Sequence, residues 1–245
     1  MLHHFNPQGR ETHMQTQLLG DRLNHIRREL EAASGGRYAP PEIIAVTKNH
    51  PAEEILPLEG LGVKCIGENR VQEIVQKLPQ LEGRDFRIHL IGRLQTNKVK
   101  YIIDQVCMIQ SVDRLPLAQE IDRQACKRGL QMPVLIQVSP AGEEQKGGIA
   151  PEDLRPFLKE VGQMQGLSVR GLMAIMPNTQ DEAYLSGLFA GMRTLFEELR
   201  EESIPGVTME HLSMGMSGDY LLAARHGATM VRIGSALMGP RDYSR

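Results

Sequence analysis

The segment Glu42-Ile-Ile-Ala-Val-Thr-Lys48 decides the fold, because it is a short apolar run that ends abruptly in a cation. Apolar residues at consecutive positions face both sides of a strand, as in a parallel sheet covered on both faces. Asn49-His50-Pro51 follows and marks the point where the chain leaves the core. A lysine held there, partly out of water, has its charged form disfavoured and its nucleophilic amine favoured. A surface lysine just past a strand is the commoner alternative, and this segment alone does not separate the two.

Seven more strand-like segments follow, and helical patterns separate them. The predicted strands span residues 43–48, 65–69, 87–92, 108–113, 133–139, 169–175, 211–215 and 230–236. The predicted helices span residues 14–33, 52–58, 71–78 (stopped by Pro79), 96–104, 116–128, 152–164, 181–202 and 219–226.

Eight short strands that alternate with helices predict an α/β fold, a single (β/α)₈ barrel with an extra N-terminal helix. A doubly wound open sheet is the main alternative, but no G-x-G-x-x-G turn follows the first strand. No linker-like stretch divides the chain, so residues 14–245 are expected to form one domain, preceded by a flexible extension over residues 1–13.

The composition excludes several classes of protein. The formal net charge is −2 and no dense Lys/Arg cluster is present, which argues against a nucleic-acid partner. The three cysteines are widely spaced and form no metal-binding pair, so no metal site and a reducing, cytoplasmic setting are expected. No apolar run is long enough to cross a membrane, and the N-terminus lacks the apolar core of a signal peptide.

The last two strands open into loops that suit a phosphate group. Ser213-Met-Gly-Met-Ser217 and Arg232-Ile-Gly234-Ser235 supply glycines, which let backbone N–H groups approach an anion, and hydroxyl donors. In (β/α)₈ barrels a phosphate site often forms after strands seven and eight. Ser217 is also predicted to cap the helix that begins near Asp219. The alternative is two ordinary Gly/Ser turns, each weak evidence by itself.

Two polar residues fall inside apolar strands. Arg232 is expected to be buried and therefore to need a partner. That partner is either a buried carboxylate, for instance Glu68, or a ligand nitrogen or anion. His89 lies between Ile88 and Leu90, and a hydrogen-bonded core histidine is as consistent with this position as a functional one.

Seven motifs, in order along the chain, resemble those of the pyridoxal 5′-phosphate (PLP) homeostasis protein family (YggS/PROSC type), related to the alanine racemase N-terminal domain. They are Ala45-Val-Thr-Lys48, Ile66-Gly-Glu-Asn69, His89-Leu-Ile-Gly92, Ser111-Val-Asp-Arg114, Gly171-Leu-Met-Ala-Ile175, Leu212-Ser-Met-Gly-Met-Ser217 and Met230-Val-Arg-Ile-Gly234. The resemblance runs from about Pro41 to Tyr243 and implies a single modified (β/α)₈ TIM barrel.

The resemblance also implies the cofactor site. Lys48 would hold PLP as an internal aldimine, and Asn69 would lie near the ring. The backbone N–H groups of Gly234 and Ser235 would bind the phosphate, with the Ser213 hydroxyl as a further donor. Arg232 would face the pyridine nitrogen. No catalytic residue and no metal ligand are expected.

A permanently protonated Arg232 keeps the ring nitrogen unprotonated, which makes the ring a poor electron sink. The chain also ends at Arg245, soon after strand eight, with no second domain to supply an opposing base. These features favour a PLP carrier or buffer that supports vitamin B6 and amino-acid homeostasis, rather than an enzyme. A monomer is expected, with PLP and PLP-dependent apo-enzymes as partners. A weakly active amino-acid racemase, a Schiff-base aldolase acting on a sugar phosphate and a pure interaction protein are the alternatives.

Overall fold

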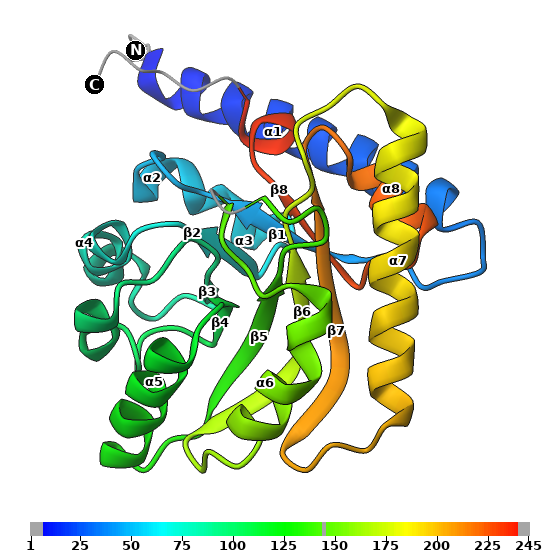
Figure 1. Ribbon diagram of the computed structural model, residues 1–245. Coiled ribbons are helices and arrows are strands. Elements are labelled where there is room, and N and C mark those ends of the chain that lie inside the picture. Colours follow the sequence, from blue (N-terminus) through cyan, green and yellow to red (C-terminus); the bar gives the residue numbers. More distant parts are fainter. Residues whose placement is uncertain (1–6, 144–145, 240–245) are drawn as a thin grey trace, which may run out of the picture.

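A closed barrel of eight parallel strands forms the centre of the molecule, in the order β1-β2-β3-β4-β5-β6-β7-β8. The computed structural model describes residues 7–143 and 146–239, with side chains from Met14 onward. Figure 1 shows the helices arranged around the outside of the strands. The strands are β1 (Glu42–Val46), β2 (Cys65–Glu68), β3 (Arg87–Leu90), β4 (Met108–Val112), β5 (Met132–Val138), β6 (Leu167–Ala174), β7 (Val207–Met216) and β8 (Met230–Ile233). The predicted barrel is therefore confirmed, and the open sheet is wrong.

The helices follow the predicted order with shifted ends. They are α1 (Pro7–Ser34), α2 (Ala52–Ile55), α3 (Pro57–Gly60), α4 (Val71–Leu81), α5 (Leu115–Lys127), α6 (Leu154–Val161), α7 (Glu182–Glu201), α8 (Tyr220–Arg225) and α9 (Ser235–Met238), with 3₁₀ turns η1 (Thr96–Tyr101) and η3 (Pro151–Asp153). Helix α1 reaches seven residues further toward the N-terminus than its predicted start at Met14. Residues 1–6 of the expected flexible extension lie outside the described residues, so that expectation stays a prediction.

Two predicted ends are wrong for physical reasons. Helix α4 continues past Pro79 to Leu81. A proline removes only the bond to the carbonyl four residues earlier, and that residue, Val75, is exposed, so water can take the place of the missing donor. Strand β8 ends at Ile233 rather than residue 236, because the chain turns at Gly234 into the short helix α9.

Helix α7 packs on the barrel through an apolar face that its sequence pattern predicts. The buried side chains of Leu185, Phe189, Met192, Phe196 and Leu199 recur at steps of four and three residues, which places them on one face. The carboxylate of Asp181 accepts a hydrogen bond of 2.9 Å from the Tyr184 N–H and caps the helix start. The apolar face then covers the outside of the barrel beside β6 and β7.

Irregular register is concentrated in one half of the barrel. Strands β8, β1, β2 and β3 pair in regular register, whereas every pair from β4–β5 to β7–β8 contains a shift. On β7 the shift lies between Ser213 and Met216 and includes Gly215, whose φ is 92°. A Cβ there would lie 2.5 Å from the Ala223 Cβ, so only glycine fits. This bulge directs the end of β7 toward the end of β8.

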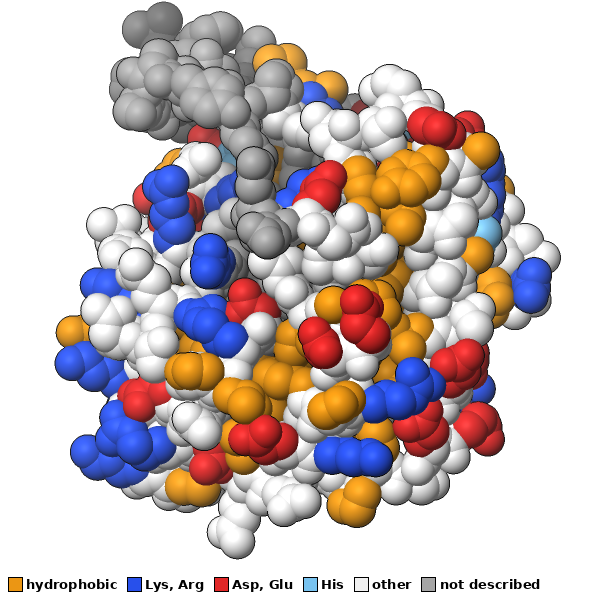
Figure 2. All heavy atoms as spheres, in the orientation of Figure 1, with side chains coloured by type: hydrophobic (Ala, Val, Ile, Leu, Met, Phe, Trp, Pro, Cys, Tyr) orange, Lys and Arg blue, Asp and Glu red, His pale blue; other side chains and the backbone are white. Residues whose placement is uncertain are grey.

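The surface carries charges of both signs, interspersed on the face seen in Figure 2. Among residues 7–143 and 146–239, no helix combines the length and apolar character that crossing a bilayer requires.

Candidate functional site

A cavity of about 420 Å³ opens at the C-terminal ends of the strands. Its lining includes Lys48, Asn69, Arg232, Gly234 and Ser235, which are five of the six residues predicted from the sequence. These residues come from the ends of β1, β2 and β8, which lie next to one another in the barrel. Ser213, the sixth, is not part of the lining and is fully buried below the cavity floor.

Lys48 lies two residues beyond β1, where the chain turns out of the barrel. The Thr47 N–H still donates to the Gly67 carbonyl of β2 at 3.1 Å, so the sheet holds the chain up to that point. Asn49 then has a φ of 63°, and its N–H donates to the Glu73 carboxylate at 2.8 Å. The lysine side chain is half-buried and lies in the cavity wall.

A buried ion pair supports this turn from the helix side. The Lys77 ammonium donates to Glu68 Oε1 at 2.6 Å and to the Thr47 carbonyl at 2.8 Å. The Thr47 hydroxyl also donates to Glu68 Oε1, at 2.6 Å. Since Glu68 pairs with Lys77, the sequence-based hypothesis that it pairs with Arg232 is wrong. Glu68 Oε2 is buried and accepts no hydrogen bond within the described part of the chain.

Asn69 follows β2 and lies against the loop after β3. Gly92 makes this close approach possible, because a Cβ at that position would lie 2.4 Å from the Asn69 carbonyl oxygen. The Ser111 hydroxyl of β4 donates to the Gly92 carbonyl at 2.7 Å and fixes the loop from the other side. The ends of β2 and β3 therefore form one wall of the cavity, and β4 supports it through Ser111.

Arg232 is a buried cation, 4% exposed, at the base of the cavity. Its guanidinium donates to the Ser213 hydroxyl and to the Ala174 carbonyl, both at 2.8 Å. Burial lowers the pKa of Arg232 to about 10, and the charge of Asp219 opposes that effect. The side chain remains protonated at neutral pH. Within residues 14–143 and 146–239, no carboxylate lies within ion-pair distance of it, and Asp219 acts on it from further away.

The loops after β7 and β8 meet through Ser217. The Ser217 hydroxyl accepts from the Gly234 N–H at 3.1 Å and from the Ala236 N–H at 3.3 Å. The predicted role of Ser217 as a helix cap is wrong, because α8 begins after Asp219, whose carboxylate accepts from the Met216 N–H at 2.6 Å. The bulge on β7 brings Ser217 to the β8 loop, where it lines the cavity.

The structure places the two serines of the β7 motif differently, and the predicted contact of Ser213 with a phosphate stays a prediction. The Ser213 hydroxyl accepts from Arg232 and donates its proton to Gln110. It therefore lies below the cavity and has no second proton to donate to a ligand. The Ser217 oxygen accepts from two N–H groups, and its side chain lines the cavity. Both serines lie in one motif, and only the bulge, which the sequence pattern does not predict, distinguishes them.

Lys146 is a cavity residue that the sequence pattern did not identify. Its ammonium donates to the Met176 carbonyl at 2.9 Å and pairs with Glu143 at 2.6 Å. The Gln137 amide donates to the Lys146 carbonyl at 2.7 Å, which ties this loop to the end of β5. Lys146 follows no strand directly, and therefore the rule that functional groups follow barrel strands does not find it.

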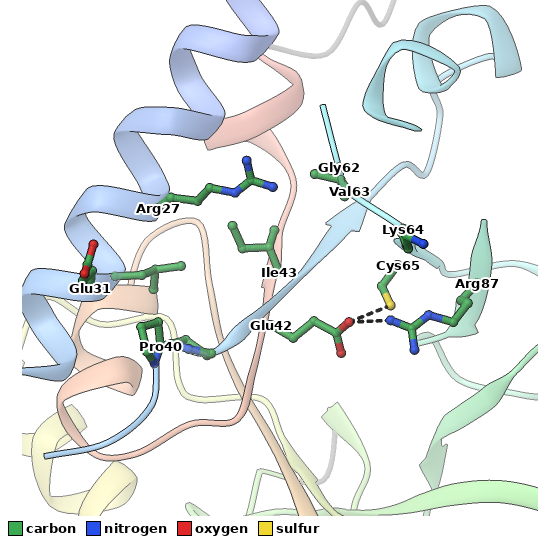
Figure 3. Close-up of a pocket in the computed structure, with 12 residues that line it drawn as sticks. Arg27, Glu31, Pro40, Glu42, Ile43, Gly62, Val63, Lys64, Cys65 and Arg87 are labelled. Atoms are coloured by element: carbon green, nitrogen blue, oxygen red, sulfur yellow. Dashed lines mark hydrogen bonds and ion pairs between the residues drawn. The ribbon is translucent and has the colours of Figure 1, made fainter. Parts of the chain in front are cut away.

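A second cavity, of about 400 Å³, lies at the opposite, N-terminal mouth of the barrel (Figure 3). Glu42 points into it and accepts from Arg87 at 2.7 Å and from the Cys65 thiol at 3.1 Å. Burial raises the pKa of Cys65 to about 12, so the thiol is protonated and a poor nucleophile. The Lys48 cavity differs from this one in that a lysine, a buried arginine and the Gly/Ser loops after β7 and β8 line it together.

The Lys48 cavity can therefore hold a small molecule with three recognisable parts. A primary amine faces the cavity from one side, and Arg232 presents N–H donors to an electron-rich atom from below. Ser217 and the backbone of Gly234 and Ser235 supply uncharged donors of the kind that bind phosphate. Ser235 opens α9, so its N–H has no acceptor within that helix. These donors fit a phosphorylated aldehyde with a basic ring nitrogen.

Comparisons with known proteins agree with this site. Residues 21–242 match the family model described as alanine racemase, N-terminal domain. The chain is 41% identical over 221 residues to the pyridoxal phosphate homeostasis protein of Aquifex aeolicus (strain VF5), which covers 90% of this chain and 96% of that protein. It is 35% identical to the protein of the same name from Schizosaccharomyces pombe, over 91% of this chain and 93% of that protein.

Solved structures give the same result. PipY of Synechococcus elongatus PCC7942, with PLP bound, is 36% identical with a TM-score of 0.79, and the match covers 90% of this chain and all of that one. Alanine racemase of Clostridium difficile 630 is 19% identical with a TM-score of 0.73, and this chain covers 56% of it. At that identity the likeness concerns the fold alone.

Proposed function

This chain belongs to the pyridoxal phosphate homeostasis protein family, and on that premise we propose that its Lys48 cavity binds pyridoxal 5′-phosphate and that the protein carries or buffers this cofactor. One observation supports this above all: Lys48, the buried Arg232 and the Gly234–Ser235 backbone line a single cavity. An amine, a ring-nitrogen donor and a phosphate site are the three contacts that the cofactor requires.

Each residue has a separate task in this proposal. Bound PLP supplies an aldehyde that condenses reversibly with a primary amine, and Lys48 provides that amine. The turn that Lys77 and Glu68 support holds Lys48 at the cavity wall. Gly234, Ser235 and Ser217 would bind the phosphate, and Asn69, which lines the same cavity, would contact the ring.

Arg232 favours storage over catalysis. A guanidinium that donates to the pyridine nitrogen keeps that nitrogen unprotonated, and an unprotonated ring withdraws electrons weakly from a bound amino acid. A carrier gains from this property, because the cofactor stays intact while it is held. We therefore propose a PLP-binding role in vitamin B6 and amino-acid homeostasis without enzymatic turnover, and keep a weak amino-acid racemase as the alternative that assay must test.

We also propose a cytoplasmic location. The three cysteines are free, which suits a reducing compartment. The partners we propose are PLP itself and apo-enzymes that receive it, with the protein acting as a monomer.

The decisive experiment compares two aldehydes. Pyridoxal has the ring and the aldehyde of PLP but lacks the phosphate. Purified protein is incubated with each, reduced with borohydride and digested, and the occupancy of Lys48 is measured by mass spectrometry. Hydrogen bonds to charged groups contribute about 1.5–3 kcal/mol each, so the loss of two should weaken the affinity for pyridoxal by about two orders of magnitude or more, and its occupancy should be far lower at equal, subsaturating concentrations.

Two variants complete the test. Lys48→Ala should lose the reducible adduct and remain folded, because the side chain lies outside the packed layers of the barrel. Lys98→Ala, in the 3₁₀ turn η1, is the control and should bind PLP as wild type does.

Two results would contradict the proposal. Equal occupancy of Lys48 by both aldehydes would exclude the phosphate site. Measurable racemisation of alanine by the purified protein would favour the racemase.

A further inference from the structure

A chain of buried hydrogen bonds runs through the barrel interior and ends at Arg232. Arg232 Nη1 donates to Ser213 Oγ at 2.8 Å, and Ser213 Oγ donates to Gln110 Oε1 at 2.7 Å. Gln110 Nε2 lies 3.0 Å from Nδ1 of His89. The four residues come from β8, β7, β4 and β3, and each is at most 4% exposed. Only Arg232 lines the Lys48 cavity, so the other three act at a distance from it.

The direction of every bond in this chain is determined. Arginine donates and never accepts, so Ser213 must accept from Arg232 and direct its own proton elsewhere. Gln110 Oε1 accepts it, and this bond orients the amide so that its N–H₂ is turned toward His89. An N–H₂ group donates, so His89 Nδ1 must be an acceptor. His89 therefore carries its single proton on Nε2 and is neutral.

The surroundings of His89 agree with a neutral ring. Glu42 of β1, Arg87 of β3 and His211 of β7 are the charged or titratable groups that act on it. Burial outweighs the attraction of Glu42 and lowers the pKa of His89 to about 4. A protonated His89 would place an N–H against the Gln110 N–H₂, and a flipped amide would deprive Ser213 of its acceptor.

We propose that Gln110 is a positioning residue for Arg232: together with Ser213 and a neutral His89, it forms a one-directional chain of hydrogen bonds that holds the guanidinium toward the ligand in the Lys48 cavity. Without the chain, Ser213 could rotate and the buried guanidinium would retain only the Ala174 carbonyl as a fixed acceptor. The part of this inference that concerns the ligand rests on the proposed function, whereas the part that concerns His89 does not.

The first experiment tests the chain in ligand-free protein. Imidazole ¹⁵N shifts are recorded by NMR on histidine-labelled protein, and the His89 signals are assigned by their loss in His89→Gln. A neutral ring with its proton on Nε2 is expected at pH 7. In Gln110→Glu, which keeps the acceptor for Ser213 but faces His89 with a carboxylate oxygen, His89 should become protonated. A wild-type His89 protonated on Nδ1 would overturn the proposal, whether or not the protein binds PLP.

The second experiment measures the effect on Arg232. Gln110→Met keeps the length of the side chain and removes both hydrogen bonds, so the PLP dissociation constant should rise about tenfold or more and the absorption band should shift. Gln124→Met is the matched control, because Gln124 is a buried glutamine on α5 far from the chain, and it should bind PLP as wild type does.

Two further variants test whether the chain of hydrogen bonds acts on Arg232 as a unit. Ser213→Ala interrupts the chain one step nearer to Arg232 and should reproduce the effect of Gln110→Met, with no added loss in the double variant. Gln110→Glu should retain most of the affinity that Gln110→Met loses, because it still accepts from Ser213. Wild-type affinity and spectrum in folded Gln110→Met or Ser213→Ala would refute the positioning role. Failure of wild type itself to bind PLP would refute the proposed function and leave the NMR result standing.

Discussion

Replacement of Lys77 by methionine should destabilise the protein strongly, since it removes one half of a desolvated ion pair. Lys77 is 8% exposed and Glu68 is 1% exposed, so both charges lie out of water. The variant leaves a buried carboxylate without its cation and the Thr47 carbonyl without its donor. Loss of one partner of a buried pair costs about 3–5 kcal/mol. That is a large part of the roughly 5–15 kcal/mol by which most domains are stable.

The stability that Lys77→Met loses should depend on pH in a defined direction. Burial raises the pKa of Glu68 above its ordinary value, and the charge of Lys77 opposes this most. Without Lys77 the pKa rises further, so between the unfolded and the folded pKa of this carboxyl the folded protein binds a proton that the unfolded chain has released. Folding is then favoured as the pH falls, and the deficit of Lys77→Met should be smaller at pH 5 than at pH 8.

Urea denaturation followed by circular dichroism measures this effect. Lys64→Met is the matched control, because Lys64 forms its ion pair with Asp85 on the surface, and its midpoint should stay at the wild-type value. Lys77→Met/Glu68→Met removes both charges and should recover much of the loss. A Lys77→Met variant that loses less than about 1 kcal/mol, with an unchanged dependence on urea, would show that the pair is not desolvated as described.

Two other predictions follow from the site. Ser217→Ala removes a donor to the phosphate, so it should weaken binding of PLP by about 10- to 100-fold and leave binding of pyridoxal unchanged; equal effects on both aldehydes would exclude a phosphate contact. His89 has a pKa lowered from 6.5 to about 4 in the folded protein, so its contribution to stability should be complete above pH 6.5 and should be lost as the pH falls to about 4. Between pH 6.5 and pH 4 the free energy of unfolding of wild type should therefore fall by about 3 kcal/mol more than that of His89→Gln, as measured by denaturation at each pH. Curves of unfolding free energy against pH that run parallel for the two proteins would refute this prediction.

The sequence predicts the barrel well because each strand signal is local. A run such as Ile43–Val46 is apolar at every position, short and rich in β-branched residues, which together indicate a strand between two covered faces. The position of Lys48 follows from the same signal, as it is the residue at which that run stops. Arg232 and Gly234 are found in the same way at the end of β8.

The errors arise where the backbone departs from its period. Nothing in Leu212-Ser-Met-Gly-Met-Ser217 indicates that β7 contains a bulge, and the bulge decides that Ser217, not Ser213, reaches the cavity. The hypothesis that Arg232 pairs with Glu68 is wrong for a similar reason: Glu68 pairs with Lys77, which lies on a helix whose orientation only the packing determines. A local sequence pattern predicts a helix or a strand, but it does not predict which side chains of two such elements will be in contact.

The bonds from Gly234 and Ala236 to Ser217 affect how a phosphate is held and released. These N–H groups have an internal acceptor before any ligand arrives, so a phosphate must share them with the serine or displace it. Loading is then an exchange, in which the enthalpy gained is the difference between two sets of bonds rather than the full strength of one. The same hydroxyl can take the N–H groups back as the phosphate departs, which lowers the barrier to departure. If the phosphate binds as proposed, a loop with its own acceptor for these N–H groups would favour exchange of the cofactor over permanent retention.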